Sequence, residues 1–96
     1  MVYFVYRMRF EFDPNKSASN KRKHGIDFIE AQALWNDPER LEGPARSLTE
    51  PRVQVIGRIQ QTLWSAFVTY RHDETIRIIS VRRARDIETR LYRTQR

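Results

Sequence analysis

The stretch that decides the fold is IRIISVRRARDIETRLY, residues 76–92. Its first part carries the β-branched side chains that are typical of a buried strand, namely Ile76, Ile78, Ile79 and Val81. Beyond residue 83 the apolar spacing lengthens to the helical period, with Ala84, Ile87 and Leu91. The stretch therefore predicts a core strand that leads directly into a C-terminal helix.

Four polar side chains should meet where this strand becomes this helix. Arg82 and Arg83 stand at the end of the strand, and Glu88 and Tyr92 lie one helical turn apart on a face beside the apolar one. Permanent positive charge is unusual in a core strand. The cluster is compatible with a solvated surface, a nucleic-acid clamp or an active site.

Composition narrows the class of protein. The chain has 96 residues, a formal charge of +6 and no cysteine, so one domain is expected and disulfides, thiolate catalysis and sulfur-bound metal are excluded. With His24 and His72 as the two histidines, no metal site is expected and no cofactor is indicated. The basic residues cluster in Lys16–His24 and Arg82–Arg96, which favours a polyanionic partner.

The N-terminal residues carry no targeting signal that the sequence reveals. The apolar run Val2–Tyr6 is far shorter than the roughly 20 residues that span a bilayer, and it lacks the features of a signal peptide. We therefore expect a cytoplasmic protein without membrane contact. Residues 1–7 are predicted to be an N-terminal extension, and residues 8–96 a single domain.

The first half of the domain predicts one strand and two short helices. Residues Met8–Phe12 alternate as a strand. A helix is expected over Pro14–Lys23, because Asp13 can cap it and Gly25 can end it, and a second over Phe28–Asn36, where Asp27 and Glu30 form a capping-box pattern.

The second half predicts consecutive strands. A brief one is expected over Arg40–Glu42, ending before Gly43, and longer ones over Arg52–Ile59 and Thr62–Tyr70, before the strand that opens the quoted stretch. Hairpin-linked strands form an antiparallel meander. The predicted fold is α+β: a small antiparallel sheet, made of a meander of three to four strands plus the N-terminal strand, with two short N-terminal helices and one C-terminal helix.

This collection of residues suits metal-free cleavage of RNA, in which the ribose 2′-hydroxyl attacks the adjacent phosphate. The reaction needs cations around the phosphate and groups that move protons. Arg58, Arg82 and Arg83 could supply the cations, and histidine, with its ordinary pKa of about 6.5, makes His24 a candidate for proton transfer. Glu88 and Tyr92 are further candidates, with an orienting role for Glu88 favoured over direct proton transfer.

Each of these assignments has a purely structural alternative. His24 precedes a helix-ending glycine, where a cation suits the helix dipole, and Tyr92 could simply close the edge of the core. Trp35 and Trp64 lie on apolar faces and are predicted to be core residues. The same basic faces would also fit a non-catalytic module that binds nucleic acid through its phosphates, or a surface that meets an acidic protein partner.

Five ordered blocks give the chain a family resemblance: FEFDPNKSASNKRKHGIDFIEAQ, NDPERLE, QVIGRI, VTYR and IRIISVRRARDIETRLY. From about Met8 to Tyr92 the chain resembles the BrnT toxins, the ribonucleases of bacterial type II toxin–antitoxin pairs. The resemblance implies a RelE-like fold and an RNA-cleaving, growth-inhibiting toxin. It also implies a BrnA-like antitoxin with a ribbon-helix-helix part, contact with operator DNA only through that antitoxin, and a dimer as an option within the complex.

The resemblance also implies site residues. The KHG, IGR and TY motifs of the family fall on residues 23–25, 56–58 and 69–70, and its closing arginines, glutamate and tyrosine fall on the C-terminal cluster. The implied catalytic set is His24, Arg58, Arg82, Arg83, Glu88 and Tyr92. The expected RNA-binding set is Lys21, Arg22, Lys23, Tyr70 and Arg85. The chain departs from the family pattern at Phe12, Arg85 and Thr89, and Thr89 removes a cation beside the expected site.

Overall fold

The computed structural model describes residues 8–46 and 50–95, so the predicted extension of residues 1–7 lies outside the described residues. The strands are β1 (Arg9–Glu11), β2 (Leu41–Ala45), β3 (Arg52–Ile59), β4 (Thr62–Tyr70) and β5 (Thr75–Arg83). The helices are α1 (Pro14–His24), the 3-10 helix η1 (Glu30–Asn36) and α2 (Asp86–Arg93). None of the described helices is long and apolar enough to cross a membrane.

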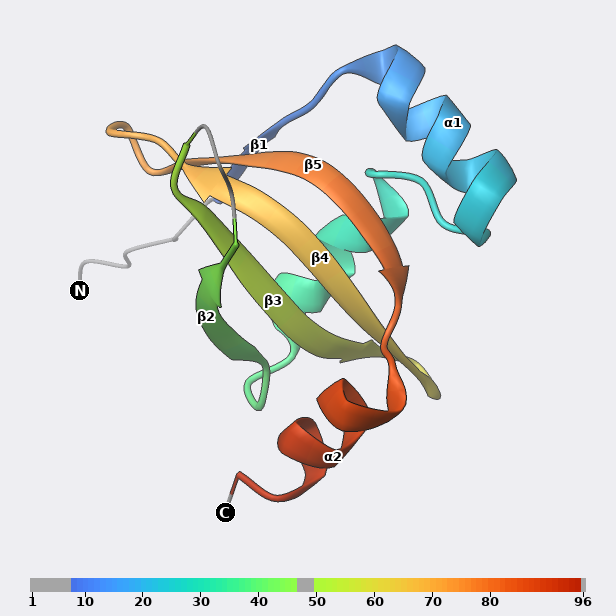
Figure 1. Cartoon of the computed structure of the whole chain (residues 1–96). Helices are drawn as coiled ribbons and strands as arrows, with labels where there is room; N and C mark the ends of the chain where they lie inside the picture. Colours follow the sequence, from blue (N-terminus) through green and yellow to red (C-terminus); the bar gives the residue numbers. More distant parts are fainter. Residues whose placement is uncertain (1–7, 47–49, 96) are drawn as a thin grey trace, which may run out of the picture.

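The predicted meander is confirmed. Strands β3, β4 and β5 are joined in sequence and pair antiparallel, and β3 and β4 have the predicted bounds. The whole sheet has the order β1-β5-β4-β3-β2 (Figure 1). Its register places Ser65 opposite Arg82 and Trp64 opposite Arg83, which brings the end of β5 beside the start of β4.

The prediction of a purely antiparallel sheet was wrong, because β1 pairs parallel to β5 and the sheet is mixed. The register joins Phe10 to Ile76. Parallel neighbours need a long crossover between them, and here residues 12–74 lie between β1 and β5. The alternation of residues 8–12 predicts a strand, but it carries no information about which neighbour that strand joins or in which direction.

The outer edge of β5 is shared between β1 and helix α1. β1 covers only the first part of β5, and beyond it the Asn20 side chain of α1 accepts a hydrogen bond from the Val81 amide (3.2 Å) and donates one to the Val81 carbonyl (2.9 Å). The Asn20 side chain also donates to the Ile26 carbonyl at 2.8 Å. A buried amide therefore satisfies backbone groups that a longer edge strand would have paired.

Helix α1 has the predicted start and capping residues and ends one residue later than expected, at His24, whereas the second helix differs more from the prediction. Asp13 caps α1, and Gly25 ends it in the left-handed region at φ 80°. Asp27 and Glu30 make the predicted reciprocal capping bonds. The helix behind them is nevertheless a 3-10 helix that begins at Glu30, two residues later than expected. Phe28 precedes this helix as a fully buried residue, and its amide donates to the Ser17 hydroxyl at 2.9 Å.

Strand β2 extends past the glycine and proline that were expected to end it. It contains Gly43 and Pro44 and pairs with β3 only, on the edge of the sheet. Proline is compatible with an edge strand because its missing N–H is needed only where a second neighbour pairs.

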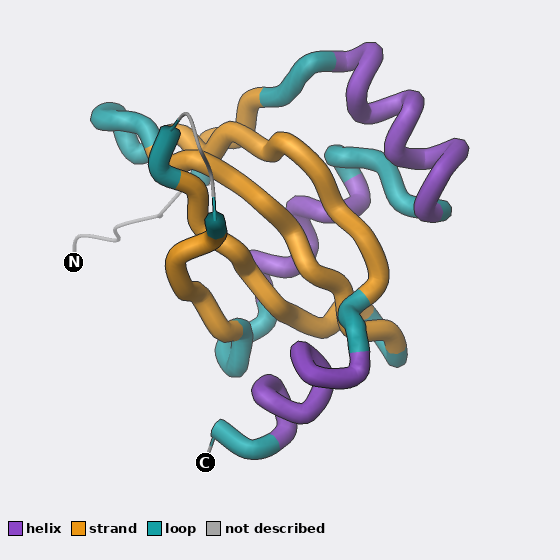
Figure 2. Tube along the Cα trace, in the orientation of Figure 1, coloured by secondary structure: helices purple, strands orange, loops and turns teal. Residues whose placement is uncertain are grey.

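The core lies between one face of the sheet and η1, which Figures 1 and 2 show behind the strands. Its members are Ile26, Phe28, Ala31, Leu34, Trp35, Val55, Ala66, Val68, Ile76, Ile78 and Val81. Trp35 is a core residue as predicted, and Trp64 is partly buried against the same cluster. Because neighbouring residues of a strand point to opposite faces, Gln54 and Phe67 lie on the other face, where α2 attaches.

Candidate active site around helix α2

The carboxylate of Glu88 holds α2 to the sheet. It accepts two hydrogen bonds from the Arg82 guanidinium at 2.7 and 2.8 Å, one from the Gln54 side chain at 2.8 Å and one from the Arg85 amide at 2.9 Å. Gln54 also donates to the Ser65 hydroxyl at 2.7 Å. The hydrogen bonds from Arg82 are the main cause that lowers the pKa of Glu88 to about 2, against the effect of its burial.

Tyr92 forms the second attachment of α2, one helical turn after Glu88. Its hydroxyl donates to Asp37 at 2.7 Å, and Asp37 also accepts from the Arg58 amide at 2.8 Å and the Glu39 amide at 2.9 Å. Burial opposes ionisation of Asp37, but these hydrogen bonds outweigh it and lower its pKa. Burial, followed by the bond to Asp37, raises the pKa of Tyr92. Asp37 therefore joins α2, β3 and the turn that precedes β2.

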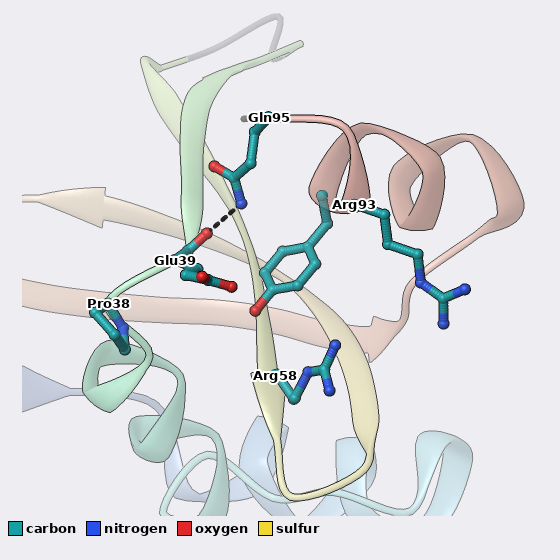
Figure 3. A pocket seen from close by; sticks show the side chains of 6 residues that line it. Pro38, Glu39, Arg58, Arg93 and Gln95 are labelled. Atoms are coloured by element: carbon teal, nitrogen blue, oxygen red, sulfur yellow. Dashed lines mark hydrogen bonds between the residues drawn. The ribbon is translucent and has the colours of Figure 1, made fainter.

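A pocket of about 290 Å³ opens beside this second attachment, and we name it the arginine pocket. It is lined by Pro38, Glu39, Arg58, Tyr92, Arg93 and Gln95 (Figure 3). Arg58 reaches it from β3 with its guanidinium carbon 5.8 Å from the centre of the Tyr92 ring, and Arg93 reaches it from α2. Gln95 donates to the Glu39 carbonyl and lies across the pocket from Arg58. Two guanidinium groups beside an aromatic ring form a site that suits a phosphate.

The two arginines that end β5 do not lie together. Arg82 faces α2, with its guanidinium carbon 5.3 Å from the centre of the Phe67 ring. Arg83 points to the other face of the sheet, where it lies 5.8 Å from the centre of the Trp64 ring. This separation follows from the alternation of side chains along a strand.

His24 and the cations around it lie on α1, which Figures 1 and 2 show apart from α2. His24, Arg22 and Lys23 are exposed near the C-terminal end of that helix. Lys21 pairs with Glu30 at 2.8 Å, and this hydrogen bond is the main cause that raises the pKa of Lys21. Since Asn20 of the same helix bonds Val81 of β5, this group is closer in the fold to the Arg83 side of the sheet than to the arginine pocket.

Tyr70 and Arg85, from the expected RNA-binding set, also take separate positions. Tyr70 lies at the far end of β4, where its hydroxyl donates to Glu42 and accepts from the Trp35 indole at 3.3 Å. Burial and then the bond to Glu42 raise the pKa of Tyr70 to about 12. Arg85 precedes α2 as its cap residue, with an exposed side chain.

Several residues of the site were not predicted, namely Asp37, Gln54, Ser65, Arg93 and Gln95. Asp37 directly follows a predicted helix and Gln54 lies inside a predicted strand, and neither position by itself indicates a role in the site. Their roles depend on contacts between residues 11 to 55 positions apart, for which the sequence offers no local signal. Within the two described ranges, no three histidine, aspartate or glutamate side chains are grouped so as to hold a metal ion.

Comparison with known proteins places this chain in a family. The model of the BrnT family, described as the ribonuclease toxin of a type II toxin–antitoxin system, matches residues 12–88. No curated protein sequence matches the chain. The crystal structure of the Brucella abortus ribonuclease toxin BrnT at 1.1 Å resolution is similar to the chain with a TM-score of 0.67 and 22% identity, covering 83% of this chain and all of that one, which shows a common fold. Because the family model covers most of the chain, the protein belongs to the BrnT family of ribonuclease toxins of type II toxin–antitoxin systems.

Proposed function

We propose that this toxin cleaves RNA without a metal ion, using the ribose 2′-hydroxyl as the nucleophile, and that the arginine pocket binds the phosphate at the cut. The observation that carries the proposal is that Arg58 and Arg93 line the same pocket beside the Tyr92 ring. Tyr92 and Arg93 belong to α2, and the ionised carboxylates of Glu88 and Asp37 fix the position of that helix. Preorganised cations stabilise the charge that develops on the phosphate in the transition state.

Within this proposal Glu88 positions groups and does not transfer protons. With a pKa of about 2 it is ionised at neutral pH, and both of its oxygens already accept hydrogen bonds. Its task is to hold Arg82 beside α2, and Tyr92 in turn supports Arg58. Both residues keep the cations in place before RNA arrives.

We propose that a second group of basic residues, outside the arginine pocket, binds the RNA on either side of the cut. Arg83 and His24 belong to the β5 and α1 side of the molecule, together with Arg22 and Lys23. We propose that RNA crosses the end of the sheet from α1 to α2, with Arg83 on a flanking phosphate. His24 stays the proposed proton-transfer residue, and its action requires the RNA to reach from the arginine pocket to the C-terminal end of α1. Tyr70 and Arg85 are proposed contacts farther along the RNA, and Lys21 is held by Glu30.

The partners of the protein and its location in the cell are also part of the proposal, and the family assignment supports them. The type II toxin–antitoxin assignment implies an antitoxin that neutralises the toxin. We propose that it is a BrnA-like ribbon-helix-helix protein, that operator DNA is contacted only through it, and that two toxin chains come together in the complex. We place the protein in the cytoplasm, where its RNA is, and residues 8–96 as its toxin domain.

The test is cleavage of a defined RNA by the purified toxin in excess EDTA. We expect cleavage to persist, and Arg58→Ala to reduce its rate by about 100-fold, the usual cost of one removed charge-stabilising group. Arg71→Ala, which changes an exposed arginine of the β4–β5 turn, is the control and should leave the rate unchanged. Loss of cleavage in EDTA would contradict the metal-free mechanism, and salt-dependent RNA binding without products would favour a non-catalytic binding module.

A further inference from the structure

Helix α2 exposes the apolar residues that its sequence pattern provides. Ile87 is 62% exposed and Leu91 is 53% exposed, whereas the buried residues of the helix are Glu88 and Tyr92. A surface helix normally turns its apolar stripe toward the core. α2 is instead attached to the rest of the domain through the Glu88 carboxylate and the Tyr92 phenol. Two aliphatic side chains one turn apart therefore stay exposed to solvent.

We name Ile87 and Leu91 the apolar ridge. With about 100° between successive residues of a helix, the two lie on one flank of α2, and Arg93, which lines the arginine pocket, lies on the other. Glu88 and Tyr92 occupy the buried face between these flanks. The ridge is therefore a surface distinct from the pocket on the same helix.

The residues nearest the ridge in the sequence include exposed arginines. Arg85 stands just before α2, and Arg90 stands on the helix between Ile87 and Leu91. Glu88 is buried and bound to Arg82, which leaves Asp86 as the exposed acid of this helix. Arg90 lies one turn from Ile87 and next to Leu91, so a partner that covers the ridge must also meet this positive charge.

We propose that the apolar ridge is a docking surface for an acidic amphipathic helix of the cognate antitoxin. Two aliphatic residues four positions apart on a helix pack well into the apolar seam of a second helix. Acidic residues beside that seam would pair with Arg90 and steer association with this basic chain. The identity of the partner rests on the proposed function, but the position of the surface rests on the exposure and charge of α2.

The test is the affinity of the toxin for the antitoxin encoded beside its gene, measured by calorimetry with the purified proteins. The double variant Ile87→Ser, Leu91→Ser should bind about 100-fold more weakly, as when central apolar contacts of an interface are removed. Ile29→Ser is the matched control, since Ile29 is 67% exposed but precedes η1 on the other side of the sheet, and it should bind as the unchanged chain does. Unchanged affinity of the double variant, with its circular dichroism spectrum and melting temperature preserved, would overturn the proposal.

A second variant tests the charge. Arg90→Glu should reduce the association rate constant and weaken its dependence on ionic strength, and an unaltered rate constant would contradict the acidic partner. If light scattering shows that the toxin alone dimerises through Ile87 and Leu91 while antitoxin affinity is insensitive to them, the ridge serves a second copy and the proposal is wrong. RNA cleavage by the free variants is measured separately and should be retained, so failure of the ribonuclease proposal is distinguishable from failure of this one.

Discussion

Glu88 of α2 and Arg82 of β5 join through two parallel hydrogen bonds of 2.7 and 2.8 Å, and this pair connects the C-terminal helix to the central sheet. Only small fractions of the two side chains are exposed, 21% for Arg82 and 11% for Glu88. A pair so placed does more to fix geometry than to add net stability, since desolvation offsets much of its attraction. Removing one partner is costly, however, because the other charge remains without compensation.

Glu88→Gln should destabilise the protein by about 3 kcal/mol and also reduce RNA cleavage. The amide keeps the shape of the side chain but leaves the Arg82 guanidinium without its counter-charge. Urea unfolding and cleavage rates of the variant check both effects. Asp86→Asn, at an exposed acid in the first turn of the same helix, is the control and should change stability by less than about 0.5 kcal/mol. Equal stability of the two variants would contradict this view of the pair.

The stability of the protein should fall steeply in acid through Glu88. Its pKa of about 2 lies below the ordinary value of 4.5, so its contribution is fully present above pH 4.5 and is lost as the pH falls toward 2. The free energy of unfolding should drop by roughly 3 kcal/mol across this window. Glu88→Gln should show a much flatter profile in the same window, and a profile as steep as that of the unchanged chain would assign the effect to other carboxylates.

Tyr92→Phe tests the attachment to Asp37. The change removes the 2.7 Å hydrogen bond but keeps the ring that lies beside Arg58, so we expect a loss of about 2 kcal/mol, the range for bonds to charged groups. Cleavage should fall less than in Arg58→Ala, because the phosphate-binding cation stays. Asp37→Asn combined with Tyr92→Phe measures the coupling in a double-mutant cycle, and additive effects of the two changes would show that the bond contributes nothing.

Gly57→Ala should destabilise the protein by about 2 kcal/mol, because an added Cβ would lie 3.0 Å from the Leu34 side chain in the core. Gly43→Ala on β2 is the matched control, since no atom lies within 4 Å of its added Cβ. Thermal unfolding of both variants checks the difference. A Gly57→Ala protein as stable as the control would mean that η1 moves away at little cost.

Asn20→Ala should cost about 3 kcal/mol, because it leaves the amide and carbonyl of Val81 and the carbonyl of Ile26 without their buried partner. Hydrogen exchange at the Val81 amide should accelerate more than elsewhere in β5. Asn15→Ala, at an exposed position of the same helix, is the control. Uniform acceleration across β5 would show that Asn20 supports global stability and not this edge.

The local elements of the fold could be predicted from the sequence because each depends on nearby residues. Asp13 and Gly25 mark the ends of α1, and the strands predicted over residues 52–59 and 62–70 have the observed bounds of β3 and β4. The family could be predicted as well, because its motifs stand in order along most of the chain. The contact between Arg82 and Glu88 could also be predicted, because the two residues are only six positions apart, at the junction of a strand and a helix that the local pattern predicts.

Only the tertiary structure decided the direction of β1, the separation of the basic residues and the exposure of the apolar ridge. The β1–β5 pairing and the bonds from Gln54 to Glu88 and Asp37 to Tyr92 join distant parts of the chain, and local patterns contain no information on such contacts. Strand alternation sends Arg82 and Arg83 to opposite faces, but which face carries the site depends on where α2 packs. In α2 the hydrophobic period predicted the helix correctly, while the polar bonds of Glu88 and Tyr92 determined which side is buried.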